Sequence, residues 1–143
     1  MPKPFFTNKR IELVKNPKIY FYDTGLRNVV IDDFRQMEMR QDKGALWEDF
    51  IYAELIKKGV DVKYWRTKAK AEVDFILNDK IPVEVKSTPT KTVVGKSLYS
   101  YIEKYNPAAA YIFTRKTEES FKIGDTAVHF LHHFAKIPTE KQL

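Results

Sequence analysis

The sequence contains no cysteine, which excludes disulfide bonds, zinc–thiolate sites and cysteine nucleophiles. It contains no apolar run of membrane length and no signal-peptide pattern, so we expect a cytoplasmic protein without a membrane partner. No internal repeat or low-complexity segment occurs in its 143 residues. The composition, 43% hydrophobic and 31% charged, is typical of a soluble globular protein, and the length suits one compact domain with a sizeable core.

The chain is basic, with 25 lysines and arginines against 19 acidic residues and a formal charge of +6. Such a charge is compatible with a polyanionic partner. The basic residues are spread along the chain and are not massed in one tail. Charge alone therefore favours a solvated basic surface slightly over a binding site.

Residues 71–86, AEVDFILNDKIPVEVK, predict a β-hairpin around a turn at residues 78–80. Every second residue on both sides of the turn is apolar: Val73, Phe75, Leu77, Ile81, Val83 and Val85. A three-residue turn pairs Leu77 with Ile81, because turn length sets the register. That register places Asp74 opposite Glu84, and Glu72 opposite Lys86.

Like charges directly opposite each other, ~5 Å apart, repel. Glu84 and Lys86 share one face of their strand, about 7 Å apart. A hard divalent cation would relieve the repulsion between Asp74 and Glu84, because Mg²⁺ takes oxygen ligands. Two alternatives stay open. A two-residue turn would place Asp74 opposite Val83, and Glu72 could form a plain ion pair with Lys86 that leaves the two acids solvated.

The clearest helix is predicted over residues 44–58, where an apolar stripe repeats at three- and four-residue spacing and Gly59 stops the helix. Glu48 borders this stripe and reads either as an exposed helical glutamate or as a site residue. Glu54 lies nearer the middle of the stripe, so its carboxylate needs a partner or a metal. A second helix over 96–105 precedes an apolar strand at 108–114, which implies parallel strands joined by a right-handed crossover.

The other elements follow from composition. An irregular arm over residues 1–17 precedes a strand over 18–22, a short helix through Val30 capped by Asp23 or Thr24, and a loop with a helical turn over 31–43. Further strands are expected over 60–66, 121–123 and 126–131, and frayed residues over 138–143. We divide the chain into an N-terminal arm with a short helical extension, residues 1–43, and a core, residues 44–143.

Two other patterns carry little weight. Gly95-Lys96-Ser97 resembles the end of a P-loop, but Thr90 stands where the earlier glycine is required. His129, His132 and His133 are expected to be surface or partly buried residues and not a metal site.

The order of these elements and acids resembles the PD-(D/E)xK nuclease superfamily, which includes restriction endonucleases and Holliday-junction resolvases. Asp74, nine intervening residues and Glu84-Val85-Lys86 match its signature, and Gly44-x-x-x-Glu48 is similar to the resolvase pattern on the first helix. No proline precedes Asp74. The resemblance implies an α/β fold with a restriction-endonuclease-like core, in which helices flank a mixed sheet of four or more strands.

A closer resemblance covers nearly the whole chain. It is to the C-terminal domain attached to many prokaryotic AAA+ family ATPases, and it rests on five blocks: Pro17-Lys18-Ile19-Tyr20-Phe21-Tyr22-Asp23-Thr24-Gly25-Leu26, Gly44-Ala45-Leu46-Trp47-Glu48, Tyr64-Trp65-Arg66, Glu72-Val73-Asp74-Phe75 and Glu84-Val85-Lys86-Ser87. The sequence contains neither the P-loop nor the winged helix of those ATPases. An AAA+ ATPase module is therefore an expected partner, and a homodimer is left open.

The resemblance implies phosphodiester hydrolysis assisted by Mg²⁺ or Mn²⁺. Asp74, Glu84 and the Val85 carbonyl would ligate the metal, Glu48 would reach it directly or through water, and Lys86 would orient or deprotonate the attacking water. Phosphate contacts are expected from basic residues just before the hairpin, although a solvated turn explains them equally well: Arg66, Lys68 and Lys70.

Two functions from different classes follow. The first is a Mg²⁺-dependent endonuclease acting on DNA, with selectivity for DNA structures or ends. The second is a catalytically silent module that keeps the nuclease fold and binds DNA or a protein partner for an ATPase.

Overall fold

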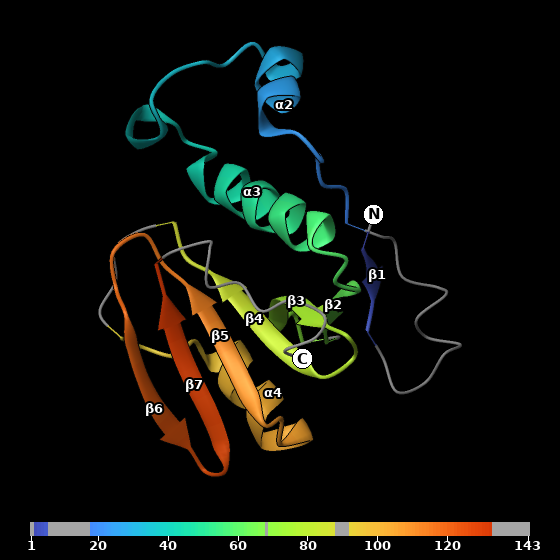
Figure 1. Cartoon of the computed structure of the whole chain (residues 1–143), viewed down its shortest axis with the longest axis vertical. Helices are drawn as coiled ribbons and strands as arrows, with labels where there is room; N and C mark the ends of the chain where they lie inside the picture. The colour runs from blue at the N-terminus through green and yellow to red at the C-terminus, as the bar shows by residue number, and fades with distance from the viewer. Residues whose placement is uncertain (1, 6–17, 68, 88–91, 133–143) are drawn as a thin grey trace.

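The computed structural model describes residues 2–5, 18–67, 69–87 and 92–132. Within these residues, seven strands form one mixed sheet in the order β1-β2-β3-β4-β5-β7-β6, with helices packed on its faces (Figure 1). The predicted α/β class with a mixed sheet flanked by helices is confirmed. The elements are β1 Lys3–Pro4, α2 Thr24–Ile31, the 3₁₀ helix η1 Met37–Met39, α3 Lys43–Lys57, β2 Val62–Arg66, β3 Glu72–Leu77, β4 Ile81–Val85, α4 Lys96–Tyr105, β5 Ala109–Phe113, β6 Glu119–Ile123 and β7 Thr126–Leu131.

Helix α3 covers one face of the sheet. Its buried residues Ile51, Tyr52 and Leu55 pack against apolar side chains of β2, β3, β4 and β5: Val62, Phe75, Leu77, Ile81, Val83 and Phe113. These residues lie on one stripe of α3 because their spacing matches the helical repeat. Glu54 is held by Lys57 at 3.0 Å, so a salt bridge satisfies its carboxylate, as one interpretation of the sequence predicted.

Helix α4 supports a second core on the opposite face. Leu98, Tyr101 and Ile102 pack against the other set of strand side chains: Trp65, Val73, Ile76, Ala110, Ile112, Val128 and Phe130. Buried residues on both faces of the central strands explain the apolar run of β5, which is buried between two layers. The predicted parallel pairing of the strands on either side of α4 is confirmed, because β5 pairs with β4 in parallel.

The hairpin turn has the predicted length. Leu77 pairs with Ile81 and Phe75 pairs with Val83. Asn78 and Asp79 adopt positive φ angles of 47° and 58°, a conformation that asparagine and aspartate tolerate better than most residues. The register on which the site prediction depends is therefore present at the base of the turn.

The strand predicted over residues 18–22 is wrong. The ring of Tyr20 stacks on Tyr52 at 4.7 Å between centroids and contacts Phe75 at 5.5 Å. The backbone N–H of Phe21 donates to Asp49 at 3.2 Å, so side-chain contacts with α3 and β3 fix this segment, which does not pair as a strand. The predicted irregular arm is wrong at Lys3–Pro4, which pairs with β2, and its residues 6–17 lie outside the described part, as do 138–143.

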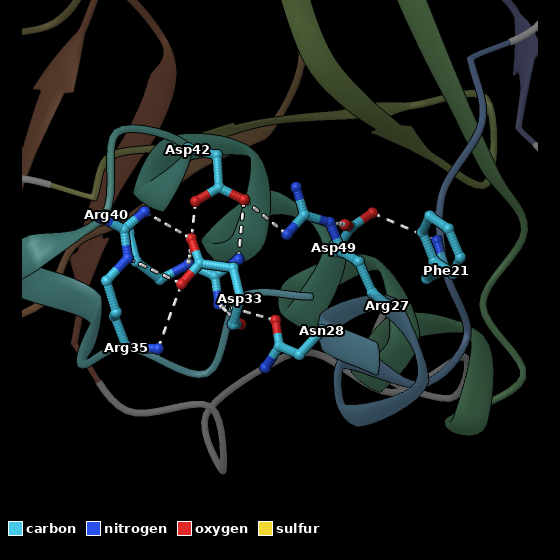
Figure 2. Close-up of polar contacts among 8 residues, drawn as sticks. All are labelled: Phe21, Arg27, Asn28, Asp33, Arg35, Arg40, Asp42 and Asp49. Carbon is cyan, nitrogen blue, oxygen red and sulfur yellow. Dashed lines mark hydrogen bonds and ion pairs between the residues drawn. The ribbon is translucent and has the colours of Figure 1, made fainter. Parts of the chain in front are cut away.

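Helix α2 attaches to α3 through charged side chains. Asp23 caps its N-terminus, as predicted, and Arg27 is its one buried residue. Figure 2 shows the network: Arg27 binds Asp49 at 2.6 Å and Asp42 at 2.7 Å, and Arg40 binds Asp42 at 2.8 Å. Large apolar side chains of α2 face solvent instead, at 59% exposure for Leu26, 61% for Val29 and 65% for Val30. This helix therefore directs its arginine inward and its apolar side chains outward.

Candidate active site

A β-bulge in β3 sets the direction of the candidate carboxylates. Lys63 pairs with Ile76 and Trp65 pairs with Val73, so one residue of β2 lies opposite two residues of β3, Asp74 and Phe75. Val73 consequently packs in the α4 core, whereas Phe75 packs in the α3 core. The sequence predicted that Val73, Phe75 and Leu77 all face the same side of the sheet. This prediction is wrong for Val73, because the extra residue in the bulge turns it to the opposite side.

Glu48 of α3 is the centre of a polar cluster on the α3 side of the sheet. Its Oε1 accepts hydrogen bonds from the Tyr20 hydroxyl and from Lys18 Nζ, the latter at 3.1 Å. The same ammonium group contacts Oε1 of Glu72. Burial opposes the charge of Lys18, but Glu48 and Glu72 outweigh burial and raise the pKa of Lys18. Glu48 is therefore a bound, partly buried carboxylate and not a solvated helical residue.

Asp74 lies in the bulge and is held by the next strand. Its Oδ2 accepts a hydrogen bond of 2.9 Å from the Val85 N–H. Burial, followed by the negative charge of Glu48, raises the pKa of Asp74 to about 7, and Glu84 adds to this increase. The Val85 N–H and Lys18 act in the opposite direction. Asp74 is thus near enough to two other carboxylates for their charges to affect its ionisation.

Glu84 is buried on the other side of the sheet from Glu48. Val83 belongs to the α3 core, so the neighbouring Glu84 points to the α4 side, where only 4% of the residue is exposed. Gly95 at the start of α4 makes room for it, because a Cβ there would lie 3.1 Å from Oε1 and 3.2 Å from Oε2. Within the described residues, Oε2 of Glu84 has no hydrogen-bond partner, although Lys86 Nζ lies 3.3 Å away.

The carboxylates do not form a compact cluster. No three acidic or histidine side chains of the described residues converge closely enough to hold a metal ion. The chemistry of the donors nevertheless suits a hard cation, since the site offers carboxylate oxygens and a buried Glu84 oxygen without a hydrogen bond. Of the predicted metal ligands, Asp74 is bound by the Val85 N–H and is affected by the charges of both Glu48 and Glu84, whereas Glu48 and Glu84 lie on opposite sides of the sheet.

The predicted phosphate contacts differ from one another. Arg66 binds Glu72 at 2.7 Å and 2.6 Å, so its guanidinium group is already paired. Lys70 is exposed in the turn before β3, with a φ of 64°. Lys68 lies outside the described residues. The ion pair of Glu72 with Lys86, which the sequence left open, is absent from the described contacts of Glu72, which binds Lys18 and Arg66 instead.

Sequence reasoning missed two residues of this site. Lys18 and Tyr20 bind Glu48 but were given no chemical role, and Glu72, placed opposite Lys86 in the predicted register, binds Lys18 instead. The available signal was the block from Pro17 to Leu26, which contributed to the family resemblance although no function was assigned to it. His129 hydrogen-bonds Ser120 and His132 pairs with Glu118, both outside this site, and His133 lies outside the described residues.

Comparisons with known proteins assign the chain to a family but not to an activity. The chain is 30% identical over 132 residues to the uncharacterized protein Mb2031c of Mycobacterium bovis and to the uncharacterized protein Rv2008c of Mycobacterium tuberculosis. Each alignment covers 87% of this chain and 30% of the relative, so the chain spans about a third of the length of these proteins. No solved structure matches the chain significantly. Among the described residues, no helix is both long and apolar enough to cross a membrane.

A family profile matches residues 43–134, which contain α3, α4 and the strands β2 to β7. The match includes Glu48, Asp74, Glu84 and Lys86, whereas Lys18 and Tyr20 precede it. The chain belongs to the family described as a domain of unknown function, DUF4143.

Proposed function

We propose that this protein is a metal-dependent nucleic-acid phosphodiesterase that cleaves DNA, with selectivity for DNA structure. The observation that carries the proposal is the buried Glu84 carboxylate. Its Oε2 lacks a hydrogen bond within the described residues and lies 3.3 Å from Lys86 Nζ. The negative charge of Glu84 also contributes to the raised pKa of Asp74. A buried carboxylate without a full set of partners is costly, and such sites are common where a protein binds a ligand or performs chemistry.

In this mechanism, Asp74, Glu84 and the Val85 carbonyl would hold Mg²⁺ or Mn²⁺, and Glu48 would reach it directly or through water. The cation, when bound, lowers the pKa of water and offsets negative charge on the phosphorus oxygens. Lys86 would orient or deprotonate the attacking water. The water oxygen would bond to phosphorus as the P–O bond to the leaving oxygen breaks, and the leaving oxygen would take a proton from solvent. Lys70 would hold a neighbouring phosphate, and Arg66 would do so only on release from Glu72.

The proposed partners are DNA and an AAA+ ATPase module, and the proposed location is the cytoplasm. The formal charge of +6 supports a polyanionic substrate. The relatives support an additional module, because about 70% of their length lies outside the aligned region. The module would belong to the same polypeptide or to a separate chain.

A catalytically silent binding module is the second candidate, and helix α2 favours it. Exposed apolar side chains cluster at Leu26, Val29, Val30 and Phe34, while Arg27 is buried. Apolar patches of this kind mark protein interfaces more often than catalytic sites. If this candidate is correct, we expect DNA binding without cleavage, or binding to a protein partner such as a second copy of the chain. Light scattering after size-exclusion chromatography would detect a second copy.

The experiment that separates the candidates is a cleavage assay on supercoiled and branched DNA with Mg²⁺, Mn²⁺ or EDTA. We expect the metal to be required and both Asp74→Asn and Lys86→Met to abolish cleavage. Lys63→Met is the matched control, since Lys63 pairs with Asp79 at 2.7 Å at the far end of the hairpin. Cleavage that is unchanged in the Asp74 and Lys86 variants would reject the nuclease. DNA binding without turnover in the wild type would favour the silent module.

A further inference from the structure

We propose that this protein has a nucleotide-binding pocket at the C-terminal end of α4, where three aromatic rings enclose a nucleobase and Lys80 binds its phosphate. The rings are those of Phe5, Tyr101 and Tyr105. The nucleotide is a free one or an unpaired residue of DNA, because the two share this chemistry. The inference goes beyond the proposed function, since binding here requires neither a metal nor cleavage.

A cavity of about 330 Å³ lies between the end of α4 and the turn that joins β3 to β4. Phe5, Tyr101 and Tyr105 line it together with Asp79 and Lys80 of the turn, and small or aliphatic residues complete the walls. Cavities that bind small molecules begin at about this size, and their walls are mostly apolar with a few polar groups. The cavity therefore has the size and the lining of a ligand site.

The three rings are inclined to one another and form a box. The ring centres of Tyr101 and Tyr105 are 4.5 Å apart with 39° between the planes, and those of Phe5 and Tyr105 are 6.0 Å apart with 68° between the planes. A planar ring placed among them meets both ring faces and ring edges, which are the arrangements that aromatic pairs prefer. The box therefore favours an aromatic ligand over an aliphatic one.

The hydroxyl of Tyr101 requires an acceptor atom on that ligand. Tyr101 lines the cavity and is only 1% exposed, and within the described residues no hydrogen bond occupies its hydroxyl. Burial, followed by Tyr105 and Asp79, raises the pKa of Tyr101, so the hydroxyl stays protonated at neutral pH. A buried donor without an acceptor is costly. The ring nitrogens and carbonyl oxygens of a nucleobase supply the acceptor that a hydrocarbon lacks.

The charges around the cavity favour an anionic group on the ligand. Lys63, which does not line the cavity, holds Asp79 at 2.7 Å. Among the described side chains, none forms an ion pair with Lys80. The ammonium group of Lys104 lies 5.1 Å from the centre of the Tyr105 ring. Three lysines thus surround one paired aspartate, and this balance attracts a phosphate and opposes a cationic ligand in the aromatic box.

The cavity is separate from the candidate active site. Helix α4 follows Gly95, which lies against Glu84, and it ends at Tyr105 in the cavity. The ten residues of α4 rise by about 15 Å between these two places. Substitutions in the cavity therefore leave the Glu84 carboxylate untouched, while one DNA molecule is long enough to contact both.

The first test measures the fluorescence of 2-aminopurine, which stacking quenches, in the presence of EDTA. The probes are 2-aminopurine riboside monophosphate, a duplex that carries 2-aminopurine as a one-nucleotide bulge, and the same duplex with this base paired. Quenching of the monophosphate would identify a free nucleotide as the ligand, and quenching of the bulge alone would identify DNA. The paired duplex should show no quenching. If neither the monophosphate nor the bulge is quenched, the proposal is wrong.

The variant Tyr105→Leu assigns the quenching to the cavity. It removes the ring and keeps most of the apolar bulk, so we expect about tenfold weaker binding of the probe that the wild type binds. Tyr99→Leu is the matched control, because Tyr99 belongs to the same helix, is 44% exposed and does not line the cavity. Equal affinities in the two variants would overturn the proposal.

The variant Lys80→Met tests the phosphate contact and decides the matter if Tyr105→Leu does not fold, because Lys80 is exposed in a turn. We expect about tenfold weaker binding of the same probe. Lys122→Met, on β6 and outside the cavity lining, should keep the wild-type affinity. An unchanged affinity in Lys80→Met would contradict the proposal. Absence of DNA cleavage would refute only the proposed nuclease, because EDTA is present in every binding measurement.

Discussion

Nε of Arg27 lies 2.6 Å from Oδ2 of Asp49, and both side chains are buried between α2 and α3. Burial raises the pKa of Asp49, although the Phe21 N–H and Arg27 oppose this effect. Removing one partner of a buried pair leaves the other charge uncompensated, so we expect Arg27→Met to lower the free energy of unfolding by about 3–5 kcal/mol. Urea denaturation followed by circular dichroism measures this change.

Arg35→Met is the matched control for Arg27. Arg35 pairs with Asp33 at 2.8 Å, but 59% of its side chain is exposed, so its loss should destabilise the fold much less than that of Arg27. The double variant Arg27→Met with Asp49→Leu should regain most of the stability, because an apolar pair of similar size avoids the desolvation of both charges. Equal losses at Arg27 and Arg35 would show that the buried pair does not hold α2.

The network around Asp42 predicts a loss of stability in acid. Hydrogen bonds from Arg40 and then Arg27 lower the pKa of Asp42, and those from Arg35 lower the pKa of Asp33 to about 2. Carboxyls whose folded pKa lies below the unfolded value of ~4 stabilise the fold above that value, and this contribution disappears as the pH falls towards 2. We expect the unfolding free energy to decrease over this range.

Asp42→Asn tests that pH dependence. The variant should be less stable than the wild type at pH 5. The difference should shrink as the pH falls to 2, because the Asp42 carboxyl of the unfolded wild type takes up a proton below pH ~4 while the folded one still resists protonation. Denaturation curves at several pH values give the comparison. Asp125→Asn, in the exposed turn between β6 and β7, should keep the wild-type profile. A difference that stays constant with pH would contradict the assignment.

Replacing Gly95 should disturb the Glu84 carboxylate of the candidate site directly. Replacement of this glycine by alanine would place a methyl group 3.1 Å from Oε1 of Glu84, so the carboxylate must shift. We expect Gly95→Ala to cost about 1–3 kcal/mol and to weaken Mn²⁺ binding. Gly44→Ala is the control, because its methyl group would meet only Ser87 Oγ at 3.8 Å, and alanine should stabilise α3 by about 0.5–1 kcal/mol. Thermal melts and Mn²⁺ titrations measure both, and wild-type Mn²⁺ affinity in Gly95→Ala would remove Glu84 from the site.

We expect Lys70 to contribute to the salt dependence of DNA binding. Its amine is exposed in the turn before β3, where it can neutralise one phosphate. We expect Lys70→Met to reduce the slope of log affinity against log salt concentration by about 1. Lys122→Met, on the opposite edge strand β6, should retain the wild-type slope. Fluorescence anisotropy with a labelled duplex at several salt concentrations gives both slopes.

Local patterns were sufficient to predict most of the fold. The apolar stripe of α3, the crossover through α4 and the pairing of Leu77 with Ile81 all depend on residues close together in sequence. Periodicity and turn length determine such features, because the side chains concerned lie within one or two elements. The positions of Glu48, Asp74 and Glu84 on α3, β3 and β4 follow from the same patterns.

The arrangement within the site could not be predicted in this way. The bulge at Asp74 depends on the partner strand β2, and it changes which face Val73 occupies. Lys18 meets Glu48 across 30 residues of sequence, and Tyr20 leaves the predicted strand to stack on Tyr52. Tertiary contacts outweighed the strand propensity of this aromatic segment, because β propensity depends on the surface available for packing.

Among the described residues, the two edges of the sheet are poor surfaces for the addition of a strand. One edge is β1, which has two residues, and the second is proline and offers no amide hydrogen. The other edge is β6, where Glu119 and Lys122 are exposed and charged. Short edges, proline and charge all oppose the addition of a foreign strand, so cross-β growth is disfavoured at both borders. The described edges of the sheet therefore resist its extension by a neighbouring chain.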